Sequence, residues 1–177
     1  MRMETQKKRS RTITWEDPLE VVRAAPGRTG LELLRELAAG RLPAPPIAQT
    51  MGFTGVSFDE GRAVFEGEAG EYLYNPIGVV HGGYAMTLLD SCMSVAVHTT
   101  LAAGERYTTL EAKINFVRPI TLDTGRVRAE GVVIHRGSTI ATAEGKIIAI
   151  STGKLLAHGT STCLISPAPP ALRATSP

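Results

Sequence analysis

Residues 75–101, NPIGVVHGGYAMTLLDSCMSVAVHTTL, restrict the possible folds more than any other part of the chain. After a Pro/Gly turn and His-Gly-Gly, an apolar segment predicts a helix from Gly83 to about Leu101, roughly 28 Å long at about 1.5 Å per residue. Because the segment is apolar on nearly every face, we expect the rest of the chain to surround most of it. One carboxylate, Asp90, interrupts it on the face that carries Met86.

Strand-like segments stand on both sides of this helix. Before it, FTGVSF and GRAVFEGEA are joined by Asp59-Glu60-Gly61, which predicts a hairpin. After Gly104, four further runs occupy residues 107–119, 125–135, 138–150 and 154–165, and their short connections favour antiparallel pairing. The sequence therefore predicts an α+β fold in which an antiparallel sheet of about six strands wraps around one long central helix.

The run at 107–119 alternates in polarity, which predicts one buried and one more hydrated face. The expected buried set is Leu110, Ala112, Ile114 and Phe116, and the expected hydrated set is Thr109, Glu111, Lys113 and Asn115.

The two ends of the chain differ in composition from this central region. Residues 1–46 predict an N-terminal extension, with a disordered basic tail and a short amphipathic helix in TGLELLRELAAG. Residues 47–165 form the predicted core domain, and the Pro-rich residues 166–177 predict a disordered tail. Whether the N-terminal helix caps a pocket or covers the sheet is left open by the sequence.

Composition excludes several functional classes. The net charge is +2 over 177 residues, and the basic residues near the N-terminus lack neighbouring aromatics, so we expect no nucleic-acid partner. Acidic residues interrupt any signal-peptide core, and Asp90 and His98 make the apolar segment a poor membrane span, so a cytoplasmic protein is expected. The cysteines, Cys92 and Cys163, have no metal-ligand spacing, and no metal site is predicted.

Two interpretations of Asp90 are open at this point. A carboxylate on an apolar helix face costs several kcal/mol unless it is hydrogen-bonded or borders a cleft, so Asp90 is either a buried acid satisfied by Ser91 or Ser94, or a reactive group. His81 and Gly82 favour the second interpretation, because free N–H groups at a helix N-terminus stabilise a developing oxyanion.

These residues carry a family resemblance. The string N-P-x-G-x-x-H-G-G-x-x-x-x-L-x-D, from Asn75 to Asp90, resembles the active-site segment of hotdog-fold acyl-CoA thioesterases of the phenylacetate-degradation type. FVRP, ending at Arg118 and Pro119, is similar to a strand end of that family, and residues 47–165 match its element order.

The resemblance implies roles for individual residues. Asp90 would attack the thioester carbonyl or activate water against it, the Gly82 N–H would polarise the carbonyl oxygen, and His81 and Asn75 would fix the loop and the substrate. Thr109 would help to hold the water from a strand of the partner subunit, although a plain surface threonine is an equal alternative.

The resemblance also implies how substrate is bound and how subunits assemble. The substrate would be an acyl-CoA held by residues at helix and strand ends, for which the candidates are Gly83, Arg118, Pro119, Arg136, Gly137 and Ser138. No cofactor would be needed, since coenzyme A is part of the substrate. The protein would be a homodimer with its sites at the seam, and further a dimer of dimers.

Other functions remain open from the sequence. An acyl-CoA hydratase or dehydratase would place its His and acid in different motifs. A non-catalytic acyl-CoA or lipid-binding module would bind without turnover, and a purely structural domain would leave the glycine pair and Asp90 unexplained. The acyl group is also open, because Met86, Met93 and Val97 near the helix face suit either an aliphatic chain or a phenylacetyl ring.

Overall fold

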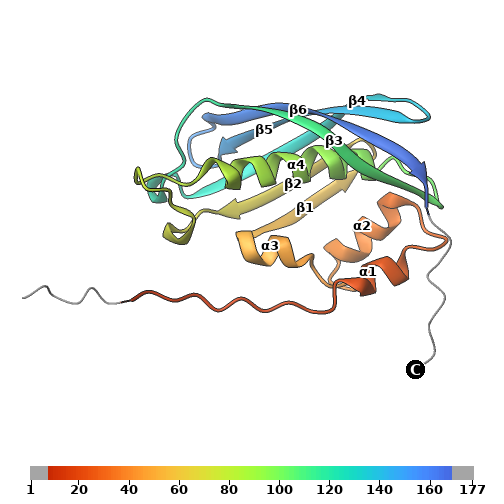
Figure 1. The fold of residues 1–177 in the computed structure, drawn as a ribbon, viewed down its shortest axis with the longest axis horizontal. Coiled ribbons are helices and arrows are strands. Elements are labelled where there is room, and N and C mark those ends of the chain that lie inside the picture. Colours follow the sequence, from red (N-terminus) through yellow and green to blue (C-terminus); the bar gives the residue numbers. More distant parts are fainter. Residues whose placement is uncertain (1–7, 169–177) are drawn as a thin grey trace, which may run out of the picture.

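The structure is a computed structural model that describes residues 8–168. One sheet of six antiparallel strands curls around a single long helix, as Figure 1 shows. The strands follow the order β1-β2-β4-β5-β6-β3 across the sheet. Their bounds are β1 (Phe53–Asp59), β2 (Arg62–Glu68), β3 (Glu105–Phe116), β4 (Arg126–Arg136), β5 (Ile140–Ala149) and β6 (Leu155–Pro167). The predicted α+β fold is confirmed.

The central helix, α4, runs from Gly82 to His98, beginning one residue before the predicted start and ending three before the predicted end. It ends where the hydroxyls of Thr99 and Thr100 donate back to the carbonyls of Ala96 (2.6 Å) and Val97 (2.7 Å). The side chains on its sheet-facing side are fully buried and form the centre of the core. They are Leu88, Leu89, Cys92, Met93, Ala96 and Val97.

Glycines in the sheet allow α4 to lie close to it. Gly131 of β4 pairs with Gly145 of β5, and both face the helix. A Cβ on Gly131 would come within 2.2 Å of the Cys92 carbonyl oxygen, so no other residue fits there without moving the helix. This close approach fixes the position of α4 along the sheet.

One side of α4 is left uncovered. Met86 is 50% exposed and Asp90 is also exposed, whereas Ser91 and Val95 beside them are half-buried. These residues recur at helical spacing and therefore form one stripe. Asp90 was expected on a buried face, and in the single chain it is not buried. The physical reason is that the sheet does not close around the helix: α4 is open between the two edge strands, β1 and β3.

A β-bulge in β3 changes which side chains face the helix. Thr109 pairs with Cys163 of β6 but Glu111 pairs with Thr162, so Leu110 is the extra residue. The predicted alternation is therefore wrong before the bulge, where Leu110 was expected to be buried and Thr109 hydrated, whereas Ile114 packs against the core as expected. Leu110 and Phe116 are 54% and 57% exposed, while Thr109 is half-buried and turned towards α4.

Three short helices precede the sheet: α1 (Leu19–Ala24), α2 (Gly30–Ala38) and α3 (Pro46–Met51). In Figure 1 they lie beside β1, with an extended segment running past them. The helix predicted in TGLELLRELAAG corresponds to α2, which starts at a capping box formed by Thr29 and Glu32. The disorder predicted for the two tails falls largely on residues 1–7 and 169–177, which lie outside the described residues.

Within residues 8–168, none of the helices combines the length and hydropathy that a membrane crossing requires.

Candidate active site

The N-terminus of α4 presents a backbone N–H without a partner among the described residues. His81 is the N-cap, and its Nδ1 accepts a hydrogen bond from the Gly83 N–H at 2.9 Å. The His81 carbonyl accepts from the Tyr84 N–H at 3.0 Å. Within residues 8–168 no acceptor meets the Gly82 N–H, so it stays free to bind an external oxygen.

The loop before α4 is held by Asn75. Its Oδ1 accepts from the N–H groups of Ile77 (3.1 Å) and Val79 (3.3 Å), and its own N–H donates to the Val79 carbonyl (2.8 Å). These bonds form a compact turn, in which Gly78 has a φ of 81°. Asn75 thus positions the segment that carries His81.

A cavity of about 380 Å³ opens beside this helix N-terminus. It brings together five of the residues singled out from the sequence: Asn75, His81, Gly82, Arg118 and Pro119. Arg118 donates one hydrogen bond to the Leu155 carbonyl (2.7 Å), and its side chain is exposed. The exposed Phe116 ring covers Gly82, where an added Cβ would lie 3.1 Å from the ring.

Asp90 and Thr109 meet further along α4. The Thr109 hydroxyl donates to the Asp90 Oδ1 at 3.0 Å, and both residues belong to the same chain. Thr109 was expected to hold the water from a strand of the partner subunit; within the single chain, the Leu110 bulge turns it towards α4 of the same chain. Ser91 and Ser94, the partners considered for Asp90 from the sequence, make no hydrogen bond to it in the described structure.

A second and larger cavity, of about 610 Å³, begins at Asp90. Its polar end is lined by Asp90, Ser91, Ser94 and Tyr107, and burial raises the pKa of the Tyr107 hydroxyl, which donates to Ser94 at 3.4 Å. Its apolar side is lined by Leu34, Leu37, Ile47, Phe53, Phe58 and Val95, and charged side chains of Arg11, Glu66, Glu68 and Arg126 line it as well.

Sequence reasoning did not identify most of this cavity. Met93 and Val97, which were expected near an acyl pocket, lie in the core with no exposed surface. The part of the lining that α4 provides includes Ser94 and Val95, which lie between Met93 and Val97 in the sequence. Other lining residues, including Leu34 and Leu37, come from the N-terminal extension. The sequence does not show which of these neighbouring residues faces the cavity. Hydrophobic periodicity predicts which residues share a helix face, but it does not predict what that face contacts.

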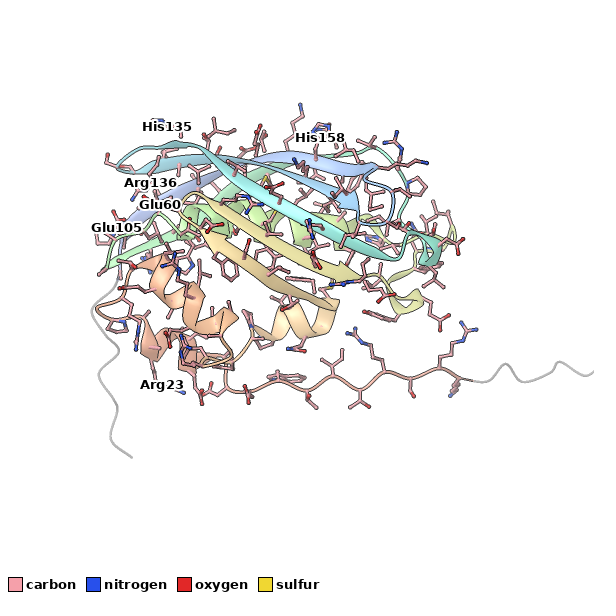
Figure 2. All side chains as sticks on the ribbon, turned by 180° about the vertical axis from the view of Figure 1, so that it is seen from behind. Arg23, Glu60, Glu105, His135, Arg136 and His158 are labelled. Carbon is pink, nitrogen blue, oxygen red and sulfur yellow. The ribbon has the colours of Figure 1, made fainter. Side chains whose placement is uncertain are left out.

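The turn after β4 is remote from the cavity that contains Arg118. Arg136 pairs with Glu105 at 2.8 Å and also donates to the Gly137 carbonyl. Figure 2 shows Arg136 and Glu105 at the same end of the sheet. Glu105 begins β3 and Arg118 follows its end, a separation of roughly 40 Å at about 3.3 Å per residue. Within one chain, Arg136, Gly137 and Ser138 therefore cannot bind the same ligand group as Arg118.

Among residues 8–168 no three His, Cys, Asp or Glu side chains lie close enough together to hold a metal ion. The two cysteines are buried and free, and burial raises the pKa of the Cys92 thiol to about 12, so it is not a reactive nucleophile. Within residues 8–168, the groups that could take part in a reaction at this helix are a carboxylate held by a hydroxyl and a helix N-terminus with a free N–H.

A curled antiparallel sheet around one long helix is the hotdog fold, and here the helix starts with a free N–H and carries a carboxylate about two turns along it. The family model of the thioesterase superfamily matches residues 77–155. A 1,4-dihydroxy-2-naphthoyl-CoA hydrolase of Listeria monocytogenes serotype 1/2a (strain 10403S) is 30% identical over 93 residues, which are 52% of this chain and 74% of that protein. The chain belongs to the thioesterase superfamily.

The chain is also similar to two further proteins. A protein of Saccharolobus solfataricus is 35% identical over 89 residues, which are 50% of this chain but only 61% of that relative's length. The solved structure of a phenylacetic acid degradation-related thioesterase of Ralstonia eutropha JMP134 has 29% identity and a TM-score of 0.67. The match covers 73% of this chain and 97% of that one. The predicted resemblance to thioesterases of the phenylacetate-degradation type is confirmed.

Proposed function

We propose that this protein hydrolyses acyl-CoA thioesters in a site shared by two subunits, with Asp90 of one subunit facing the Gly82 N–H of the other. The observation that carries the proposal is the position of these two groups on α4. Gly82 is half-buried and Asp90 is exposed, and they are eight residues apart, which is roughly 12 Å along a helix. One carbonyl group cannot contact both within a single chain.

A two-fold axis between two subunits would bring Gly82 of one subunit close to Asp90 of the other. If two α4 helices pack antiparallel with the axis at Met86, the residue midway between Gly82 and Asp90, each Gly82 N–H lies beside the partner's carboxylate. Met86 is 50% exposed, and the neighbouring edge strand β3 exposes Leu110 and Phe116. An isologous dimer buries such a self-complementary apolar surface and covers the free strand edge.

The chemistry follows from these two groups. Asp90, held by Thr109, takes a proton from water, and the resulting hydroxide attacks the thioester carbon. The carbonyl oxygen becomes an oxyanion that accepts from the Gly82 N–H of the partner subunit. When the C–S bond breaks, the coenzyme A sulfur leaves with the electron pair and takes the proton back from Asp90, so the products are the free acid and coenzyme A.

Other features support a CoA thioester as substrate. The hydrolase of Listeria monocytogenes acts, by its name, on a naphthoyl-CoA. The cavity beside Gly82 carries the exposed guanidinium of Arg118, which suits a phosphate of coenzyme A. Arg136 suits this role less well, since its guanidinium is already paired with Glu105.

A panel of acyl-CoA substrates with detection of the released thiol tests the activity. The shared site is tested by mixing two variants, Asp90→Asn and Gly82→Pro, each expected to be nearly inactive. After subunit exchange, a mixed dimer contains one site with both native groups, so roughly a quarter of the native activity should return, since half of the dimers are mixed and each has one of two sites intact. Failure to recover activity, in a mixture shown by mass to contain mixed dimers, would refute the shared site. A binding module would bind acyl-CoA and release no thiol.

A further inference from the structure

The N-terminal extension is fixed to the domain at two places. At the start of α2, the Gly30 N–H donates to the Leu101 carbonyl at 3.0 Å. An added Cβ on Gly30 would lie 1.8 Å from the His98 carbonyl oxygen, so only glycine permits this contact between α2 and the end of α4. Earlier in the extension, Arg11 donates to the carbonyls of Gln49 and Thr50, and its guanidinium lies 3.9 Å above the Tyr72 ring. The extension is therefore docked in a defined place.

Leucines on α2 face two different surroundings. Leu33 and Leu34 are equally buried, with 5% and 4% exposure. Leu34 and Leu37 line the 610 Å³ cavity, whereas Leu33 and Leu31 do not. One part of the helix thus anchors the extension, and another part forms a wall of the cavity.

One part of this cavity is apolar, as an acyl group requires, although the charged side chains of Arg11, Glu66, Glu68 and Arg126 line another part. Asp90, Ser91 and Ser94 stand at one end, where a thioester carbonyl would react, and Leu34 and Leu37 stand on the apolar side together with Phe58. Its volume lies within the range of about 300–1,000 Å³ typical of small-molecule sites, well above the needs of an acetyl group.

We propose that α2 forms the distal wall of the acyl pocket, and that Leu34 and Leu37 limit the size of the acyl group that the enzyme accepts. The substrates are then acyl-CoAs with apolar acyl groups larger than acetyl. This inference rests on the proposed function, since it assigns the acyl end of the same site. It also assigns the extension a role that its sequence left open.

The test compares tryptophan substitutions at two half-buried positions of one helix. Leu37→Trp fills the cavity, and Leu31→Trp adds the same bulk where no cavity lies. For Leu37→Trp, the ratio of kcat/KM for decanoyl-CoA to that for acetyl-CoA should fall about tenfold or more, because a pocket that loses volume rejects the longer chain. For Leu31→Trp the ratio should stay within about threefold of the native value. A change of this size is smaller than the discrimination that a pocket gains from one methylene group. An unchanged ratio in Leu37→Trp, or an equal change in both variants, would overturn the proposal.

A second pair works in the opposite direction. Leu34→Ala enlarges the cavity, so the preferred acyl chain should become longer. Leu33→Ala removes the same atoms from an equally buried site outside the cavity, and the preference should stay unchanged. A common shift in both alanine variants would indicate loosened docking of the extension and not a pocket wall.

Binding separates failure of this inference from failure of the proposed function. Calorimetric titration of acetyl-CoA and decanoyl-CoA in an Asp90→Asn background measures acyl discrimination without rapid turnover. If the parent releases no thiol from any substrate, the hydrolase proposal fails. The pocket wall still stands if Leu37→Trp weakens decanoyl-CoA binding selectively, and it fails if decanoyl-CoA binds no more tightly than acetyl-CoA in every variant.

Discussion

The hydroxyl of Thr109 donates a hydrogen bond of 3.0 Å to the carboxylate of Asp90, and a single inserted residue in β3 makes this contact possible. A regular strand would place Thr109 on the face opposite to Ile114, which packs against the core. The bulge at Leu110 moves Thr109 to the helix side. A second threonine–carboxylate hydrogen bond involves β3: the Thr162 hydroxyl donates to the exposed Glu111 carboxylate at 2.9 Å.

This pair of contacts supplies a matched control for Asp90. Asp90→Asn should reduce kcat on the order of a hundredfold or more, because an amide cannot accept the proton of the attacking water. Stability should change little, since Asp90 is exposed in the single chain. Glu111→Gln, another exposed carboxylate bonded to a threonine, should leave kcat within a few-fold. The measurement is steady-state kinetics with thermal melting of each protein. A folded Asp90→Asn variant with near-native turnover would remove Asp90 from the mechanism.

Gly82 can be tested without disturbing the helix. Gly82 is the first residue of α4, a position that favours proline, and His81 before it has the extended ψ of 137° that proline requires. Gly82→Pro removes the free N–H, and kcat should fall by about a hundredfold, the cost of one lost oxyanion donor. Gly82→Ala adds a Cβ against Phe116 but keeps the N–H, so it should retain much more activity. Equal activity in the two variants would show that the N–H plays no part.

The exposed stripe of α4 predicts the oligomeric state. The native protein should be a dimer or larger, and Met86→Glu should produce a monomer, because a charge on the proposed two-fold axis meets its own copy. Hydrolysis should be lost together with the dimer. Ile77→Glu changes a more exposed residue, at 82%, away from the axis and should stay dimeric. Light scattering at micromolar concentration measures the mass, and a strictly monomeric native protein would contradict the shared site.

His98 predicts a dependence of stability on pH. Burial lowers the pKa of its imidazole to about 4, against about 6.5 for an unperturbed histidine. Below pH 6.5 the unfolded chain therefore binds a proton that the folded chain does not, so stability is complete above pH 6.5 and is lost as the pH falls towards 4. Between pH 7.5 and 5.5 the loss should be about 1 kcal/mol. Urea unfolding at each pH measures the free energy of unfolding. In His98→Gln, the part of its pH dependence that comes from His98 should vanish.

Metal ions should have no effect on the reaction. The proposed mechanism uses a carboxylate and a backbone N–H, so incubation with EDTA or added zinc should leave the rate of thiol release unchanged. Activity lost on chelation and restored by one metal would reveal a site outside this mechanism.

The sequence alone determined the elements, the fold and the family. The apolar segment with its glycine-rich start specified one long helix, and the turn signals and strand runs specified an antiparallel sheet, because local propensity and hydrophobic periodicity are carried by neighbouring residues. The string from Asn75 to Asp90 resembles the active-site segment of a thioesterase family, and this resemblance predicted the superfamily.

Tertiary structure alone decided how these elements face one another. Asp90 is exposed because the sheet leaves one stripe of α4 open, and Thr109 faces it because a bulge at Leu110 reverses the alternation of β3. Leu34 and Leu37 reach the cavity because Gly30 lets α2 touch the end of α4. Each of these facts depends on contacts between residues far apart in the chain, whose orientation a local pattern does not encode.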